Sequence, residues 1–236
     1  MAISSPAPPK PWNPPPRPYT TPYPPLTTKL GLAATTGVLF FVVYGILNAY
    51  TASLSGVPSL YAGWEHRIPF VPWMILPYVS LDLLFVGAFL LCQSQRELRV
   101  LGQRVSLAIL LSALGFWLMP LRFGFERPVT TGLPGVLFDL LSLDLPFNQC
   151  PSLHISLGLL IGTVYWRHTR GAWRVLSTLW FVLILASPLL VYQHHAVDIL
   201  GGALAWLLCL LLVPGDLVRH QRLALRYLGL TTSLAG

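Results

Sequence analysis

Long apolar segments, separated by short polar ones, run through the chain after its first 28 residues. Most of these segments approach the roughly 20 residues that a helix needs to cross a bilayer. The pattern predicts six transmembrane helices, at Leu30–Tyr50, Trp73–Cys92, Leu101–Leu121, Ile155–Trp166, Ala172–Val191 and Ile199–Val213. We therefore expect an all-α membrane protein, a bundle of six transmembrane helices.

The composition agrees with a membrane location. Hydrophobic residues make up 54% of the 236 residues and charged residues only 10%, which is too little charge for a soluble domain of this size. The net charge is +7, but the basic residues are spread over short loops, so we expect no nucleic-acid partner. Cys92, Cys150 and Cys209 are scattered and predict neither a disulfide framework nor a thiolate metal site.

The two ends of the chain differ from its middle. Eleven of the 22 prolines lie in the first 25 residues, and proline at this density does not support helices or sheets. We predict a disordered or polyproline II cytoplasmic tail over residues 1–28; docking of this tail into an aromatic groove is an alternative. Residues 29–215 form one membrane domain, and residues 216–236 form a basic cytoplasmic segment.

Positive charges fall mainly on one side of the predicted bundle. Twelve of the fifteen Lys and Arg residues belong to the termini and to the even-numbered connections between spans: Lys10, Arg17, Lys29, Arg96, Arg99, Arg104, Arg167, Arg170, Arg174, Arg219, Arg222 and Arg226. The opposite side holds only Arg67, Arg122 and Arg127. The positive-inside rule therefore places both termini in the cytoplasm.

Two polar clusters interrupt the apolar pattern on the predicted outward side. The stretch HHAVD opens the sixth span, and the spacing of His194 and His195 to Asp198 lets either histidine meet the carboxylate. A carboxylate of this kind orients an imidazole and supports its charged form. Gly201 and Gly202 follow one turn later and would let another helix approach closely.

The second cluster, NQCPSLHISL, opens the fourth span. Ser152 is a suitable N-cap and His154 lies in the first helical turn. Upstream, LRFGFERP brings Arg122 and Arg127 to the same side, and guanidinium groups match phosphate oxygens in a bidentate way. A helix N-terminus beside these groups predicts a phosphate site.

Other interpretations of these residues remain open. Taken singly, each histidine is more often a structural residue at the membrane interface, and only the conjunction of the clusters favours function. A metal site made by His154, His194, His195 and Asp198 is a second hypothesis, placed second because nearby arginines would repel a cation. Asp82, halfway along the second span, is expected to face the bundle interior.

The order RP, PSLH and HHAVD followed by GG resembles the type 2 phosphatidic acid phosphatase (PAP2) superfamily. The resemblance covers Arg122 to Gly202, and PSLH with HHxxD is most similar to the branch with inositol phosphorylceramide synthases and related bacterial membrane phosphatases. Two positions depart from the family. Pro120 stands where the first motif has a lysine, and Ser187-Pro188 stands where the third motif usually has Ser-Arg.

The resemblance implies a role for each matching residue. His194 would be the nucleophile, Asp198 its orienting partner, and His154 the proton donor for the leaving oxygen. Arg127 and Ser152 would hold the phosphate, with Arg122 substituting for the missing lysine, and we also assign His195 to phosphate binding. No metal or other cofactor is implied.

These observations together predict an integral membrane lipid phosphatase that works through a phosphohistidine, with its site on the extracytoplasmic side of the cytoplasmic membrane. The partner is a phosphorylated or diphosphorylated lipid. A lipid phosphotransferase that moves a phospho-head group to a lipid alcohol is the first alternative, and a non-catalytic membrane protein with a relic site is the second. The chain does not specify the lipid or the oligomeric state.

The charge asymmetry leads to a topology prediction. Reporter fusions placed after Arg174 and at either terminus should report a cytoplasmic location, because the flanking basic residues resist translocation. A fusion after Arg127 should report the opposite side. An extracytoplasmic signal after Arg174 would contradict the placement of the histidine clusters.

Overall fold

Seven α-helices and two 3₁₀ helices form the regular structure of residues 23–141 and 145–215, the part of the chain that the computed structural model describes. Within these residues there is no strand. The elements are α1 (Leu26–Ala52), η1 (Gly63–Arg67), η2 (Pro72–Met74), α2 (Ile75–Leu91), α3 (Gln95–Leu118), α4 (Gly132–Leu141), α5 (Leu153–His168), α6 (Gly171–Leu190) and α7 (Ala196–Leu212). The predictions for residues 1–22 and 216–236 lie outside the described residues.

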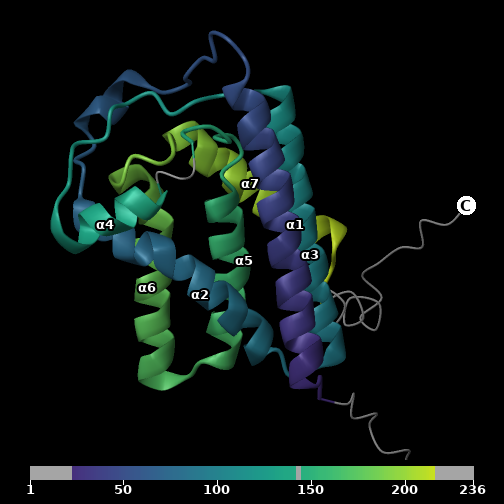
Figure 1. Ribbon diagram of the computed structural model, residues 1–236. Helices are drawn as coiled ribbons and strands as arrows, with labels where there is room; N and C mark the ends of the chain where they lie inside the picture. The colour runs from purple at the N-terminus through teal and green to yellow at the C-terminus, as the bar shows by residue number, and fades with distance from the viewer. Residues whose placement is uncertain (1–22, 142–144, 216–236) are drawn as a thin grey trace, which may run out of the picture.

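Six of these helices coincide with the six predicted spans, and they alternate in direction along the chain (Figure 1). By length and composition four stretches can cross a membrane: α1, η2 with α2, α3 and α6. The other two, α5 with 16 residues and α7 with 17, are shorter. The structure thus shows an all-helical protein with four candidate spans, and the six-span bundle remains a prediction.

The ten-residue helix α4 was not predicted, because its apolar segment is far shorter than a span. It lies in the connection between α3 and α5. Its Phe138 packs with Ile75 and Val191 in a small second hydrophobic cluster. The helix therefore covers the end of the bundle where α2 begins and α6 ends (Figure 1).

Serine caps begin two of the helices. Ser94 Oγ accepts a hydrogen bond from Glu97 N at the start of α3, at 3.1 Å. Ser152 Oγ accepts one from Ile155 N at the start of α5, at 3.4 Å. An N-cap side chain satisfies an N–H group that has no partner inside the helix. The predicted start of a helix at Ser152 is confirmed.

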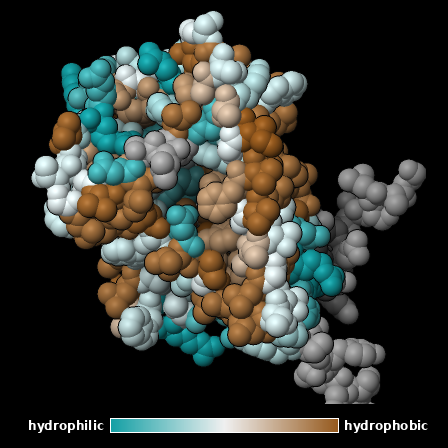
Figure 2. Space-filling view, in the orientation of Figure 1, coloured by the Kyte–Doolittle hydropathy of each residue, from teal (hydrophilic) through white to brown (hydrophobic). Residues whose placement is uncertain are grey.

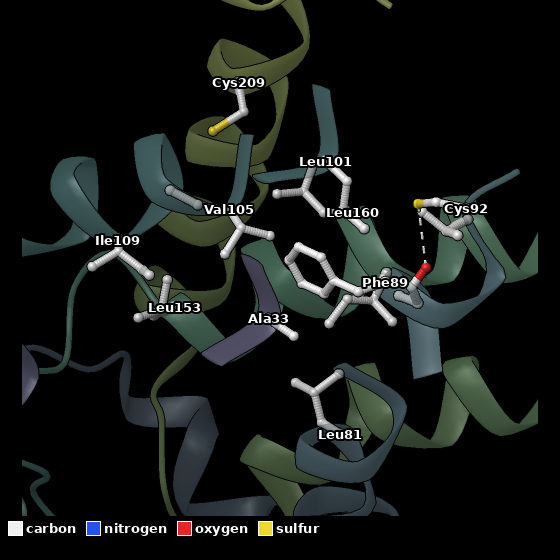
Figure 3. Close-up of a cluster of buried hydrophobic side chains, with 14 of the residues drawn as sticks. Ala33, Leu81, Phe89, Cys92, Leu101, Val105, Ile109, Leu153, Leu160 and Cys209 are labelled. Atoms are coloured by element: carbon white, nitrogen blue, oxygen red, sulfur yellow. Dashed lines mark hydrogen bonds between the residues drawn. The ribbon is translucent and has the colours of Figure 1, made fainter. Parts of the chain in front are cut away.

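The largest hydrophobic cluster lies where α1, α2, α3, α5, α6 and α7 meet. Side chains from these helices point toward one another in Figure 3, among them Phe89, Val105, Leu160 and Cys209. Large apolar side chains also cover the outside, and in Figure 2 hydrophobic residues occupy much of the sides of the molecule. A surface of this kind suits contact with lipid.

The start of α7 packs directly on the start of α5. A Cβ atom at Gly202 would lie 2.4 Å from the Ser152 carbonyl oxygen, and one at Gly201 would lie 3.1 Å from Pro151 Cα. Only glycine leaves room for so close an approach. The prediction that this glycine pair admits another helix is confirmed.

The expectation for Asp82 was wrong. The side chain is exposed on α2, whereas the neighbouring Leu81 is buried in the main cluster. The buried face of α2 passes through Leu81, Ala88 and Phe89, and the next residue along a helix turns about 100° away from such a face. Asp82 therefore lies beside the packed face rather than on it.

The close contact at Gly202 generates a stability prediction. Gly202→Ala should lower the free energy of unfolding by about 1–3 kcal/mol, because the new Cβ would overlap backbone that has little room to move. Gly45→Ala is the matched control, since a Cβ at that helical glycine meets nothing within 4 Å. Thermal unfolding in detergent measures both; equal stabilities would contradict the packing.

Candidate functional site

The two predicted polar clusters meet at one end of the bundle. Here α5 and α7 begin and α6 ends, and the long connections after α1 and α3 pass over them (Figure 1). Ser152 N donates a hydrogen bond to the Asp198 carbonyl oxygen at 3.0 Å, which ties the two helix starts together. Segments more than 40 positions apart in the sequence are thus neighbours.

His194 and Asp198 form a buried pair at the turn between α6 and α7. The Nδ1 atom of His194 lies 3.5 Å from Asp198 Oδ2, and both side chains are largely shielded from solvent. This Nδ1 atom has no hydrogen bond within the described residues. The same carboxylate oxygen accepts the N–H of His195 at 2.8 Å. Asp198 therefore caps α7 and also faces the imidazole of His194.

His154 lies in the first turn of α5, next to His194. Its Nε2 atom is 3.2 Å from the Ile184 carbonyl oxygen on α6, and its ring stacks on Tyr78 of α2 with centroids 4.3 Å apart. The two histidines are close enough for their charges to interact. Donation of Nε2–H to the carbonyl leaves Nδ1 as the atom that can take up and release a proton.

Arg127 approaches the same turn from the connection between α3 and α5. Its Nε and Nη2 atoms donate to the carbonyl oxygens of Val191 and Tyr192, at 3.3 and 3.5 Å. Burial lowers the pKa of Arg127, and an electrostatic interaction with Tyr78 partly opposes this shift. Tyr78 thus interacts with both the arginine and His154. The guanidinium of Arg127 is therefore held at the same turn that carries His194.

His195 has a different environment, although it follows His194 directly. Its Nδ1 atom donates to Glu65 Oε2 at 2.9 Å, and its Nε2 atom accepts the N–H of Gly124 at 3.0 Å. The residue is 1% exposed, and its ring stacks on Tyr61 and Phe123. Both ring nitrogens are therefore used, and the contacts define the neutral tautomer with its proton on Nδ1.

The side chains of three residues predicted to bind phosphate are occupied by other contacts. His195 has no ring nitrogen left for an anion. Ser152 is fully buried as the cap of α5. The exposed Arg122 donates from Nε to the Val57 carbonyl oxygen in the connection after α1. The partners of His195 and Arg122 are distant in the sequence, whereas Ser152 serves as the cap of its own helix. The structure does not support these three assignments.

The four-ligand metal hypothesis also loses its support. Two of its members, His194 and Asp198, lie together, but the nitrogens of His195 point to Glu65 and Gly124. Within the described residues no group of three or more His, Cys, Asp or Glu side chains has an arrangement suited to a metal ion.

Two residues that contact the histidines were not among the predicted site residues. Glu65 is fully enclosed in the outer loop, where its oxygens accept from Ala62 N at 2.8 Å, Ala196 N at 3.1 Å and the His195 ring. Tyr78 stacks on His154. Glu65 is one of few acidic residues in an apolar chain, and this rarity could have indicated a role. Tyr78 lies on an apolar helix, and nothing in the local sequence distinguishes it.

The Glu65 contacts generate a prediction. Glu65→Ala should lower the free energy of unfolding by about 2–4 kcal/mol, because several shielded donors lose their acceptor. Glu126→Ala, at an exposed glutamate in the connection after α3, should change the free energy of unfolding by less than about 0.5 kcal/mol. Thermal unfolding compares the stabilities of the two variants. If both lose the same free energy of unfolding, the hydrogen bonds of Glu65 do not stabilise the histidine end of the bundle.

The chain was compared with protein-family models, with curated proteins and with solved structures, and nothing matches it.

Proposed function

We propose that this protein is a membrane phosphatase that removes phosphate from a phosphorylated or diphosphorylated lipid through a phosphohistidine. The observation that carries the proposal is the convergence of His194, Asp198 and His154 with one arginine at the end of an apolar bundle. These are the parts that phosphoryl transfer needs: a nucleophile, a proton donor and positive charge for the phosphoryl oxygens. The motif resemblance to type 2 phosphatidic acid phosphatases supports the same assignment.

In the first step the Nε2 lone pair of His194 attacks phosphorus, and the bond from phosphorus to the lipid oxygen breaks. The ring becomes cationic, and its Nδ1–H faces Asp198 Oδ2 across 3.5 Å, where the carboxylate stabilises the charge. His154 takes up a proton on Nδ1 when the phosphate anion binds and gives it to the departing oxygen, while its Nε2–H stays on the Ile184 carbonyl. Arg127 neutralises charge on the phosphoryl oxygens.

In the second step water attacks the phosphohistidine. His154, now neutral, takes the proton of that water, the bond between phosphorus and nitrogen breaks, and free phosphate leaves. His194 returns to its starting form beside Asp198. A histidine nucleophile thus divides one displacement into two easier ones. We place the reaction on the extracytoplasmic side of the inner membrane, as the charge asymmetry suggests.

A lipid phosphotransferase is the second candidate. The position where the family's third motif usually has an arginine is Pro188, and its carbonyl oxygen accepts the N–H groups of Gln193 and His194. This position is therefore part of the turn that carries His194, and it provides no guanidinium. The loss occurs also in the sphingolipid synthase branch of the family, where the acceptor is a lipid alcohol instead of water.

The test is a substrate screen with purified protein in detergent. Phosphatidate, a prenyl diphosphate and a phosphatidylinositol-type lipid are offered, each with and without a lipid alcohol. Released phosphate supports the phosphatase, and a new phospholipid that forms only with the alcohol supports the transferase. If no substrate of either kind turns over, both enzyme proposals fail and the non-catalytic alternative stands.

The active substrate then allows a comparison of histidine variants. His194→Ala should abolish turnover and the acid-labile phosphoenzyme, because the attacking nitrogen is lost. His154→Ala should lower the rate by roughly 10²–10⁴ for the lipid, since the leaving oxygen needs a proton, and much less for an activated aryl phosphate. Rates and radiolabelled phosphoenzyme are measured.

The exposed His66 provides the control, and His66→Ala should keep most of the activity. A phosphoenzyme that persists in His194→Ala and disappears in His195→Ala would contradict the assignment of the nucleophile.

A further inference from the structure

A cavity of about 250 Å³ lies at the opposite end of the bundle from the histidines. It is formed where α3 begins and where α5 and α7 end, and its lining includes Ser94, Glu97, Arg104, Thr163, Arg167 and Gly215. Two arginines, Arg104 and Arg167, therefore face one cavity that has a single carboxylate in its described lining.

Arg104 is buried in this cavity, with only 8% of its surface exposed. Its Nε atom donates to the Val213 carbonyl oxygen at 3.0 Å. A Cβ at Gly215 would lie 3.1 Å from Nη2, so the guanidinium lies directly against the backbone at the cavity edge. No other hydrogen bond of Arg104 is present within the described part of the chain. A buried charge without a full set of partners is costly and calls for an anion.

A second guanidinium faces the same space. Arg167, on the last turn of α5, lines the cavity and is otherwise exposed. The positive charges of Arg104 and Arg167 interact unfavourably. Two cations that converge on one cavity are stabilised by an anion between them.

The one carboxylate in the described lining does not neutralise this pair. Glu97 Oε1 lies 2.7 Å from His168 Nε2, and Glu97 Oε2 accepts the N–H of Gln93 at 2.9 Å. Both oxygens are therefore engaged at the start of α3. Ser94 Oγ accepts from Glu97 N and keeps its own O–H for donation.

We propose that this cavity binds a phosphate group between Arg104 and Arg167. Planar guanidinium groups match phosphate oxygens in a bidentate way, and the Ser94 hydroxyl adds a donor. The phosphate can belong to the head group of an anionic phospholipid in the adjacent leaflet or to free inorganic phosphate. The site is distinct from the histidine cluster and does not depend on the proposed phosphatase activity.

The experiment uses the full chain in detergent and two probes. In one arm, delipidated protein is mixed with equal amounts of phosphatidylglycerol and phosphatidylcholine, and retained lipid is measured by native mass spectrometry. In the other arm, inorganic phosphate is titrated and the melting temperature is followed. Retention of phosphatidylglycerol identifies a lipid head group, whereas a melting shift with phosphate and no retained lipid identifies the free ion.

Arg104→Gln and Arg167→Gln should each weaken binding of the effective probe by at least about tenfold, the usual effect of losing a charge-assisted hydrogen bond. Arg170→Gln is the matched control: this exposed arginine lies three residues further along and is not among the lining residues. Arg167→Gln keeps the test valid if Arg104→Gln does not fold, because Arg167 makes no hydrogen bond within the described residues.

Two results would overturn the proposal. One is binding of both probes that is unchanged in Arg167→Gln. The other is probe binding that appears only when Asp216, which follows Gly215 in the sequence, is replaced in Asp216→Asn. In that case the Asp216 carboxylate would be the anion that the two arginines need. Asp216 itself lies outside the described residues.

Discussion

The carboxylate of Glu65 connects the outer loops to the helices that carry the histidines. It accepts N–H groups from Ala62 just before its own 3₁₀ helix, from the first residue of α7 and from the His195 ring. The ring in turn accepts the N–H of Gly124, in the connection that also carries Arg127. A buried carboxylate is stable only with such a set of donors. The positions of α7, of the turn at His194 and of the arginine connection all depend on this contact.

The adjacent residues His194 and His195 therefore have different roles in this structure. His195 is enclosed by aromatic rings and uses both nitrogens to join backbone segments. His194 faces Asp198, whose carboxylate also caps α7. Because the cap holds the carboxylate in place, the distance between Asp198 and the His194 ring is set by backbone geometry. This preorganisation is what a nucleophile oriented by an acid requires.

The two ends of the bundle handle charge in different ways. At the histidine end the acidic residues Glu65 and Asp198 face backbone N–H donors and imidazoles of the chain itself. At the other end Arg104 and Arg167 share a cavity whose carboxylate is engaged elsewhere. In an apolar bundle each buried charge needs a partner. The first end obtains its partners from the chain itself, and we assign the partner at the second end to a phosphate group.

Features of local origin were predictable from the sequence. The positions of the six main helices, the Ser152 cap and the pairing of His194 with Asp198 follow from hydropathy, capping chemistry and a four-residue spacing. The tertiary structure alone decided the partners of His195, the contact of Tyr78 with His154 and the exposure of Asp82. These contacts join segments up to 130 positions apart, and they depend on how apolar helices rotate and slide against one another. Generic apolar side chains specify that a helix is buried in membrane or protein, but not which neighbour it meets.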